Sequence, residues 1–510
     1  MKLKKHLALI MSAALLSAAA LSGAAFAEDT WNGTVGTVPA EVNGVITITT
    51  GAQLAALAAD VNNSPQPQSY VGITVRLGDD INLANHTWTP IGYFTAYWAP
   101  QNNKAFSGIF DGAGHTIRGL NVVNPSNGET AALFGYIDFV DPDGSSKPYI
   151  SREPQETTVG GIWGAAYEEA LARGLTGDEA ESFAMKRAAA VESFGVNPKA
   201  RAARTSSPPT ISGGTVKNLI VKGSVSNSVG QGAAGIVCWN DGKVQNCRFE
   251  GSVTCNPNNR AYVGGICSLI GEFASIQNCV ASVNAQAHSG SGSQPYSYAG
   301  GILGFSYVST TSSDIFTNYG SVANCSVEQG STINSQMDAG GVVGGFAYKV
   351  YNCSSAASSV LLGGQPSGTY RGGIIGAFGA ATNCYWLKTA NNANQPTYAV
   401  GGTNITTGRK SSTSSLPKAS VLFSSPLSVS VGQNRNITRS YYPSVAGANT
   451  PTLPIWASNN VSVATVSSGT VHGVAQGSAT IMGSGASSPA WQPQQASMCV
   501  KPECYVKVTP

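Results

Sequence analysis

The amino-acid sequence predicts an all-β protein: a solenoid of parallel strands with a helix-rich insertion, followed by a β-sandwich. Only 11% of the 510 residues are charged and 60 are glycine, a composition typical of short strands joined by tight turns. A unit that contains a short glycine motif and an Asn-Cys pair recurs five times. Short runs near the C-terminus alternate apolar and polar residues, as strands do.

The first 27 residues have the features of a secretory signal peptide. Three lysines precede an apolar run over 7–21, and Ala25-Phe26-Ala27 is a small-x-small cleavage site. The alternative is an uncleaved membrane anchor, which the short apolar run disfavours. Cleavage before Glu28 would leave 26 basic and 26 acidic residues. We therefore expect an exported protein, secreted or at the cell surface, with no transmembrane segment after cleavage.

The repeated unit has two anchors. The first is Gly-[Ile/Val]-x-small, found at 235–238, 265–268, 301–304, 341–344 and 373–376. The second is an Asn-Cys pair, found at Asn246-Cys247, Asn278-Cys279, Asn324-Cys325, Asn352-Cys353 and Asn383-Cys384. Successive pairs are 32, 46, 28 and 31 residues apart. Units this short cannot each build a core, so the repeat predicts coils stacked on one another.

The repeated Asn and Cys residues predict a ladder inside the stack. Asn side chains can hydrogen-bond from coil to coil, and the small Cys side chains can fill the interior. Stacked cysteines would lie about one strand spacing apart, ~4.8 Å, but the disulfide dihedral rarely fits an in-register stack. We expect buried free thiols there. Cys238, Cys255 or Cys267 remain open to pairing elsewhere, and Cys499 with Cys504 is a candidate disulfide.

The repeated units resemble the GLUG motif of bacterial surface and secreted proteins. Val75–Gly92 and Phe106–Asn124 are similar to the first coils of that family, and Ile46–Asn62 reads as a strand followed by a capping helix. The resemblance covers about residues 45–395 and implies a right-handed parallel β-helix. It divides this part into an N-terminal cap with first coils over 28–137 and repeat coils over 213–395. The motif's last Gly is replaced by Cys238 and Ser268 in the first two full units.

Residues 138–212 interrupt the β pattern. Ala165–Arg173 and Asp178–Phe194 are rich in good helix formers, and Thr176 with Glu179 matches a capping box. Apolar residues in the second segment recur at helical spacing, so one face should lie on the solenoid. We expect an inserted helical hairpin, which either binds a partner or covers a coil edge.

The C-terminal part begins after a linker over 396–417, whose Ser411–Ser415 stretch is rich in Ser and Thr. Four short sequence motifs follow in order over 418–510: Val429-Ser-Val431-Gly432, Trp456-Ala-Ser458, Val463–Val466 and Gly473–Ile481. They resemble a bacterial immunoglobulin-like domain of group 2. The resemblance implies an immunoglobulin-like β-sandwich, used in surface proteins as a spacer or adhesive module, with Trp456 in the sandwich core.

The sequence contains no recognisable catalytic set. It lacks the His-Glu-x-x-His motif of zinc proteases, the Gly-x-Ser-x-Gly elbow and any phosphate-binding loop. Glycoside cleavage needs two carboxylates about 5–10 Å apart; Asp79, Asp80 and Asp111 are the concentrated acids, but Asp beside a turn usually bonds the local backbone. No Cys-x-x-Cys pair or His near a Cys cluster suggests a metal site. We expect no catalytic residue, cofactor or metal.

Aromatic residues in two loop regions are the candidate binding residues, because aromatic faces stack on sugars and anchor protein partners. They are Tyr93, Phe94, Tyr97 and Trp98 in one loop, and Tyr296, Tyr298, Tyr307, Phe316 and Tyr319 in loops flanking the third repeat. The alternative is that these residues cap the solenoid or pack against the insertion.

The leading functional hypothesis is a non-enzymatic, adhesin-like surface or secreted protein that binds a glycan or an extracellular protein. The low charge argues against nucleic-acid partners. One alternative is a β-helix polysaccharide lyase or hydrolase, which would hold clustered acids in a groove. Another is a purely structural component of the cell envelope.

Overall fold

The computed structural model describes residues 30–66, 68–95, 102–125, 130–138, 214–271, 274–290, 296–306, 320–363, 369–377, 379–445, 450–485 and 501–510. The expected signal peptide and nearly all of the expected helical hairpin lie outside these residues.

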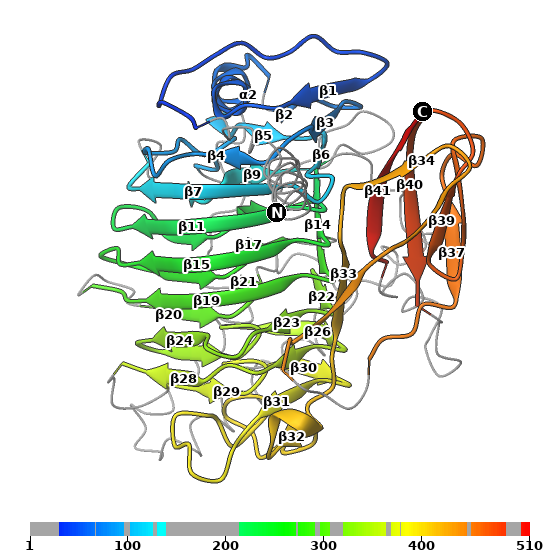
Figure 1. The fold of residues 1–510 in the computed structure, drawn as a ribbon. Coiled ribbons are helices and arrows are strands. Elements are labelled where there is room, and N and C mark those ends of the chain that lie inside the picture. Colours follow the sequence, from blue (N-terminus) through cyan, green and yellow to red (C-terminus); the bar gives the residue numbers. More distant parts are fainter. Residues whose placement is uncertain are drawn as a thin grey trace, which may run out of the picture.

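Most of the described strands form a stack of parallel coils (Figure 1). The predicted all-β chain of stacked parallel strands is confirmed. The first sheet contains β1 (Val45–Ile48), β3 (Thr74–Leu77), β6 (Ile109–Asp111), β10 (Thr215–Lys217), β14 (Lys243–Gln245), β18 (Ser275–Gln277), β22 (Ser321–Ala323), β26 (Ala347–Tyr351) and β30 (Gly379–Thr382). The second contains β4 (Ile81–Asn82), β7 (Thr116–Val123), β11 (Ile220–Asn227), β15 (Arg248–Cys255), β19 (Val280–Ala287), β23 (Ser326–Val327), β24 (Thr332–Ser335), β27 (Ser354–Ser355), β28 (Ser359–Leu362), β31 (Tyr385–Leu387) and β32 (Arg409–Lys410).

Two shorter sheets complete the coils. The third contains β8 (Thr130–Ala131), β12 (Gly232–Ala234), β16 (Ala261–Gly264), β20 (Ser297–Gly300), β25 (Asp338–Gly340) and β29 (Arg371–Gly372). The fourth contains β2 (Gln68–Ser69), β5 (Ala105–Phe106), β9 (Phe134–Ile137), β13 (Val237–Asn240), β17 (Cys267–Ile270) and β21 (Leu303–Ser306). Successive strands of one repeat therefore belong to different sheets, as β14, β15, β16 and β17 do.

The register keeps equivalent residues of successive coils on top of one another. Val216 pairs with Val244, and Val244 with Ile276. All three side chains are fully buried, and a slip of one residue would turn them outward. The buried apolar residues form one continuous core along the stack.

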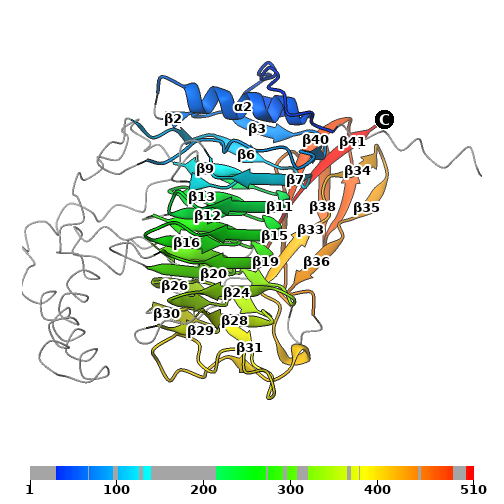
Figure 2. The same cartoon turned by 90° about the vertical axis from the view of Figure 1, so that its left-hand side faces the viewer.

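Helix α2 (Gly51–Asn63) lies across the N-terminal end of the stack (Figure 2). Its N-cap is Thr50, whose hydroxyl accepts a hydrogen bond from the Gln53 backbone at 3.2 Å. Leu54, Leu57 and Val61 are fully buried at helical spacing. The helix therefore covers the first coil, which would otherwise expose the end of the core.

The stack continues beyond residue 395, although the predicted linker begins at 396. Ile375 forms a parallel bridge with Val400, and β31 pairs with β32. Val400 is buried at 1% exposure. Apolar side chains at 399–400 thus close the far end of the core, and the link to the C-terminal strands is shorter than expected. It includes the 3-10 helix η3 (Thr413–Ser415).

The C-terminal strands form three small sheets around their own core. These are β33 (Ser420–Phe423) with β36 (Arg439–Tyr442); β34 (Leu427–Ser430), β41 (Glu503–Thr509), β40 (Gly477–Ser484) and β37 (Ile455–Ser458); and β35 (Asn434–Asn436), β39 (Thr470–Gly473) and β38 (Ala464–Ser467). Strands β34 and β41 pair in parallel. The pairs β40–β41, β37–β40 and β38–β39 are antiparallel. Val471, Ile481 and Val506 are fully buried between these sheets.

This C-terminal domain lies along the flank of the solenoid (Figure 2). The side-chain amide of Asn278 bonds both backbone groups of Val421, accepting from its N–H at 2.8 Å and donating to its carbonyl at 2.6 Å. The Ser420 hydroxyl donates to the Asn324 carbonyl at 2.7 Å. The first strand of the domain is thus hydrogen-bonded to two successive coils.

Charged and polar side chains extend this contact toward the N-terminal coils. Lys217 pairs with Glu503 at 2.7 Å, and Arg248 donates to the Tyr442 hydroxyl at 2.7 Å. The Asn246 amide donates to the Lys501 carbonyl at 3.0 Å. The domain is therefore fixed beside the stack rather than extended beyond its end, as a spacer would be.

Candidate binding site

The described members of the predicted aromatic loop lie partly inside the protein. Phe94 is 6% exposed and stacks on Trp239 with ring centroids 4.1 Å apart. Tyr93 is half-buried and forms an antiparallel bridge with Lys104. Phe94 therefore packs against the solenoid and offers no free face. Tyr97, Trp98, Tyr307, Phe316 and Tyr319 lie outside the described residues.

Phe94 belongs to a larger cluster, here called the aromatic corner, on the third and fourth sheets. Its members are Phe94, Tyr136, Trp239, Tyr262, Tyr298 and Phe305. Tyr262 and Tyr298 pair in register and stack with centroids 5.7 Å apart. The Tyr136 hydroxyl donates to Asp241 at 3.1 Å. All but Phe305 are at most 8% exposed, so the corner is a packed structural cluster.

One acid of this corner is unusual. Asp338 on β25 stands next to Tyr298 in register and is 5% exposed. It accepts a hydrogen bond from the Tyr370 backbone at 2.9 Å. Desolvation raises its pKa to about 8 despite this bond. Asp338 is therefore protonated at neutral pH and does not act as a fixed negative charge.

The three acids considered for glycoside cleavage have structural partners. Asp80 accepts from the Thr116 backbone at 2.9 Å and lies 3.0 Å from the His115 ring. Asp79 accepts from the Asp80 backbone at 2.8 Å. Asp111 is buried; it accepts from the Asn218 amide at 3.0 Å and lies 3.4 Å from Arg76. Each carboxylate bonds its own turn or the neighbouring coil.

The recurring asparagines stand one above another at the same turn of each coil. All five predicted ladder residues have a positive φ, between 51° and 54°: Asn246, Asn278, Asn324, Asn352 and Asn383. The amide of Asn278 donates to Asn246 at 2.7 Å, and that of Asn383 donates to Asn352 at 2.7 Å. The preceding unit has Asn218-Leu219 in place of an Asn-Cys pair. Its Asn218 extends the row, because the side-chain oxygen of Asn218 accepts a hydrogen bond from the Asn246 amide at 3.1 Å.

The cysteines after these asparagines form a second, interior row. Cys247, Cys279, Cys325, Cys353 and Cys384 are all buried with free thiols. Each thiol lies 3.6–3.8 Å from a backbone carbonyl of the preceding coil. Burial raises the pKa of four of these thiols, Cys279, Cys325, Cys353 and Cys384, well above the ordinary value.

The candidate disulfide partner Cys499 lies outside the described residues. Cys504 is buried, and its thiol lies 3.4 Å from the Ser424 carbonyl. Within the described residues, no group of three or more His, Cys, Asp or Glu side chains could hold a metal ion. In the same part of the chain, no helix has the length and apolar character needed to cross a membrane.

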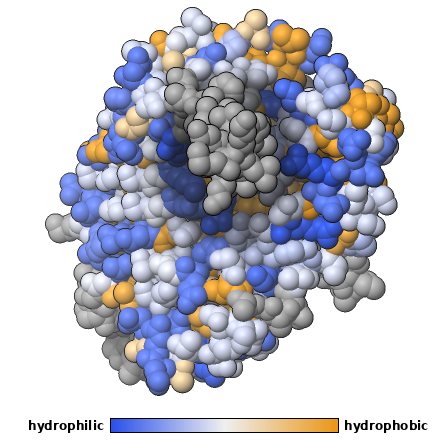
Figure 3. All heavy atoms as spheres, in the orientation of Figure 1, coloured by the Kyte–Doolittle hydropathy of each residue, from blue (hydrophilic) through white to orange (hydrophobic). Residues whose placement is uncertain are grey.

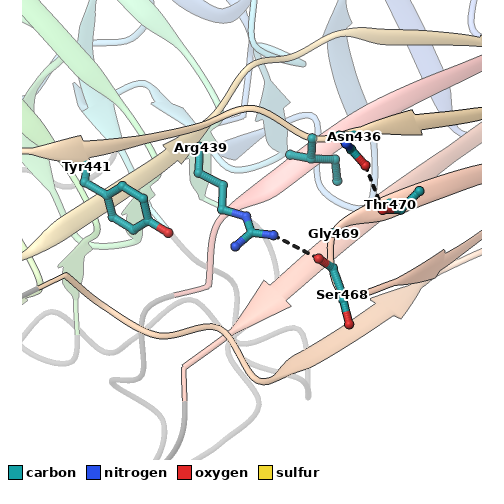
Figure 4. A pocket seen from close by; sticks show the side chains of 7 residues that line it. Asn436, Arg439, Tyr441, Ser468, Gly469 and Thr470 are labelled. Atoms are coloured by element: carbon teal, nitrogen blue, oxygen red, sulfur yellow. Dashed lines mark hydrogen bonds between the residues drawn. The ribbon is translucent and has the colours of Figure 1, made fainter.

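A polar pocket of about 460 Å³ lies in the C-terminal domain (Figure 4). Its lining residues are Asn436, Ile437, Arg439, Tyr441, Ser468, Gly469 and Thr470. Strands β35 and β36 supply one wall, and the turn between β38 and β39 supplies the other. None of the binding residues predicted from the sequence lines this pocket.

Arg439 is the only charged residue in this lining. Its guanidinium donates to the Ser468 carbonyl at 2.9 Å and lies 5.0 Å from the centre of the Trp456 ring. Trp456 in turn stacks on Phe423 at 5.5 Å. Trp456 is half-buried, so it both packs on the domain core and supports the arginine.

The coloured part of the molecular face in Figure 3 shows hydrophobic residues in small separate groups among hydrophilic ones. Broad apolar patches are typical of protein docking surfaces. This face therefore favours recognition by polar groups over recognition by a large apolar interface.

No family model matches the chain, and no curated protein matches it. One similar solved structure is described as a "putative immunoglobulin A1 protease from Bacteroides ovatus". It shares 15% identity with a TM-score of 0.37, over 72% of this chain and 84% of that chain. A likeness this loose bears on neither the fold nor the activity of this chain.

Proposed function

We propose that this protein is a non-enzymatic binding protein, exported through its N-terminal signal and acting in the secreted state or at the cell surface. The solenoid serves as a rigid support, and the C-terminal domain presents a polar pocket to a glycan or an extracellular protein. The observation that carries this proposal is the pocket at Arg439, whose charged group is held in place without a carboxylate partner among the described residues.

The state of the acidic side chains supports binding over catalysis. Asp79, Asp80 and Asp111 bond turns and neighbouring coils, whereas a glycosidase needs a pair of carboxylates free to meet substrate. The arrangement therefore gives the lyase or hydrolase alternative no specific support.

We also propose that the solenoid is a right-handed β-helix of the GLUG type and that the C-terminal domain is immunoglobulin-like. Supporting the first is the Asn at one left-handed turn of every repeat. The immunoglobulin-like assignment is supported by the order of the four sequence motifs and by the buried core between the sheets of the domain. The lateral contacts suggest a second binding element rather than a free spacer.

The test is binding of the purified mature protein to a glycan array and to a panel of extracellular matrix proteins. The expected result is selective binding to at least one of these ligands. Incubation with pectin, alginate and glycosaminoglycan polymers, followed by a reducing-end assay, should show no cleavage. A blank result on both panels would contradict the proposed function, and turnover of a polymer would favour the enzyme.

A further inference from the structure

We propose that the Arg439 pocket binds a carboxylate-bearing sugar, so that the ligand is an acidic polysaccharide. This inference rests on the proposed function and names its ligand class. Four features of the described residues carry it: the fixing of Arg439, the uncommitted polar groups beside it, the charge distribution of the chain and the geometry of the guanidinium.

The arginine is held in a defined position. Ser468 and Gly469 form a two-residue turn with φ values of 52° and 89°, the combination typical of a tight hairpin turn. A Cβ on Gly469 would lie 2.4 Å from a guanidinium nitrogen of Arg439. The turn therefore leaves room for the guanidinium, which the Trp456 ring and the Ser468 carbonyl then hold.

Most of the donors on this fixed cation have no partner among the residues that the structure describes. Arginine has five N–H donors, and Arg439 uses one of them in a hydrogen bond to Ser468. Among the described residues it has no carboxylate within ion-pair distance. A surface arginine with a purely structural role gains little from a fixed geometry, whereas a receptor for an anion benefits from one because less entropy is lost on binding.

Neutral polar groups surround the guanidinium, as Figure 4 shows. The Tyr441 side chain points toward Arg439, and its hydroxyl makes no hydrogen bond to a described residue. The Asn436 carbonyl accepts from the Thr470 hydroxyl at 2.7 Å, which leaves the Asn436 amide nitrogen as a donor. A ring carrying several hydroxyl groups beside a carboxylate matches this mixture of one cation and neutral donors and acceptors.

The charges of the chain are separated along the sequence. Residues 418–510 contain five Lys or Arg residues and one acid, Glu503, whereas residues 28–417 contain 21 basic and 25 acidic residues. Glu503 pairs with Lys217 of the solenoid, so it does not neutralise the domain surface. Arg435, Arg439, Lys501 and Lys507 are exposed. Such a field attracts a polyanion and orients it toward the pocket.

The geometry favours a carboxylate sugar over nucleic acid or a membrane surface. A planar guanidinium matches a carboxylate through two parallel hydrogen bonds. Nucleic acid would need a row of aromatic stacking platforms or a groove dense in cations, and a membrane surface would need clustered Lys and Arg beside an apolar face. The described pocket has one cation in its lining and hydroxyl groups around it.

The experiment compares binding of the full mature chain to polygalacturonate, neutral dextran and dextran sulfate by affinity electrophoresis at two salt concentrations. The variants are Arg439→Gln, Tyr441→Phe and the control Arg435→Gln. Arg435 is a matched control because it is also exposed, also donates to a backbone carbonyl (Ser428, 2.8 Å) and lies outside the pocket lining. Thermal unfolding of each variant establishes that the fold is retained.

The wild type should bind polygalacturonate, bind it less at high salt, and not bind dextran. Loss of charge-assisted bonds in Arg439→Gln should weaken binding by about 10–100-fold, and Tyr441→Phe by roughly 2–10-fold. Arg435→Gln, which removes the same net charge, should change it less than about threefold. The Tyr441 variant keeps the test decisive if the arginine variant unfolds.

Two outcomes would overturn this inference while leaving the proposed function intact. One is equal loss of binding in the Arg439 and Arg435 variants, which would mean that only net charge matters. The other is tight binding to dextran sulfate with no preference for polygalacturonate. Failure to bind any glycan or matrix protein would instead contradict the proposed function itself.

Discussion

At the scale of the residue, Asp338 links burial to stability in a way that pH can reveal. An unfolded Asp ionises near its ordinary pKa, about 3.9, whereas burial raises the folded pKa of Asp338 to about 8. Between these values the folded state binds one more proton than the unfolded state. The stability contributed by protonated Asp338 is therefore present at low pH and is lost as pH rises from about 4 to about 8.

The variant Asp338→Asn should remove this dependence. Because the amide is neutral at every pH, its free energy of unfolding should exceed that of the wild type by a margin that grows by about 1.4 kcal/mol per pH unit over this window. Urea unfolding at pH 5, 6 and 7 measures the margin. A constant difference between the two proteins would contradict the buried, protonated acid.

Asn278 allows backbone strain to be separated from side-chain bonding. Its φ is 52°, and its amide bonds both Asn246 and Val421. Asn278→Ala should lower the free energy of unfolding by about 2–4 kcal/mol, through left-handed strain and an unpaired buried N–H. Asn278→Gly should cost less, because glycine accepts this φ.

The control for this prediction is Asn383→Gly. Asn383 has nearly the same φ, 53°, but it is exposed, so the loss should be below about 1 kcal/mol. Equal losses at positions 278 and 383 would mean that the contact with β33 contributes nothing.

At the scale of the element, the row of buried cysteines predicts slow alkylation of the native protein. Thiolates, not thiols, react with alkylating reagents, and burial raises the pKa of Cys279, Cys325 and Cys353 well above its ordinary value. These residues should resist iodoacetamide at pH 8 in the native protein and react once urea unfolds it. Mass spectrometry of labelled peptides measures both states; rapid native labelling would show that the interior row is open to solvent.

The coil was predictable from sequence because its cause is local and repeated. The Asn at each turn adopts a left-handed conformation that Asn tolerates better than most residues, so the same residue recurs at Asn246, Asn278 and the later units. The end of the stack was less predictable. The residues around Val400 lack the repeated motifs. Val400 nevertheless pairs with Ile375, and this pairing buries the apolar side chains of the last coil.

The candidate site was harder to predict because it is assembled across distant segments. Phe94 was a reasonable binding candidate, but it stacks on Trp239, and no local pattern shows which aromatic side chain a distant coil will bury. The Arg439 pocket combines two strands with the Ser468-Gly469 turn. A signal existed in the sequence: the near absence of acids after Asp338 indicates a basic surface there.

At the scale of the whole molecule, two bodies of opposite net charge are joined side by side. The acidic coils and the basic C-terminal domain meet at Lys217–Glu503, Asn278–Val421 and Arg248–Tyr442. These contacts come from successive coils, so they fix the orientation of the domain as well as its position. A fixed domain presents its pocket in a single direction from the solenoid, which suits a protein that holds a large polymer.

The central claim is that solenoid and C-terminal domain form one rigid support, and hydrogen exchange tests it most directly. Strand β33 contacts the solenoid through the Ser420 hydroxyl and the backbone of Val421. The exchange rate of the Val421 N–H therefore reports on the junction. The account predicts that peptides covering 418–424 exchange as slowly as those covering β15 and β19. Exchange of 418–424 within seconds, while β15 and β19 stay protected, would show that the domain moves freely and would contradict the account.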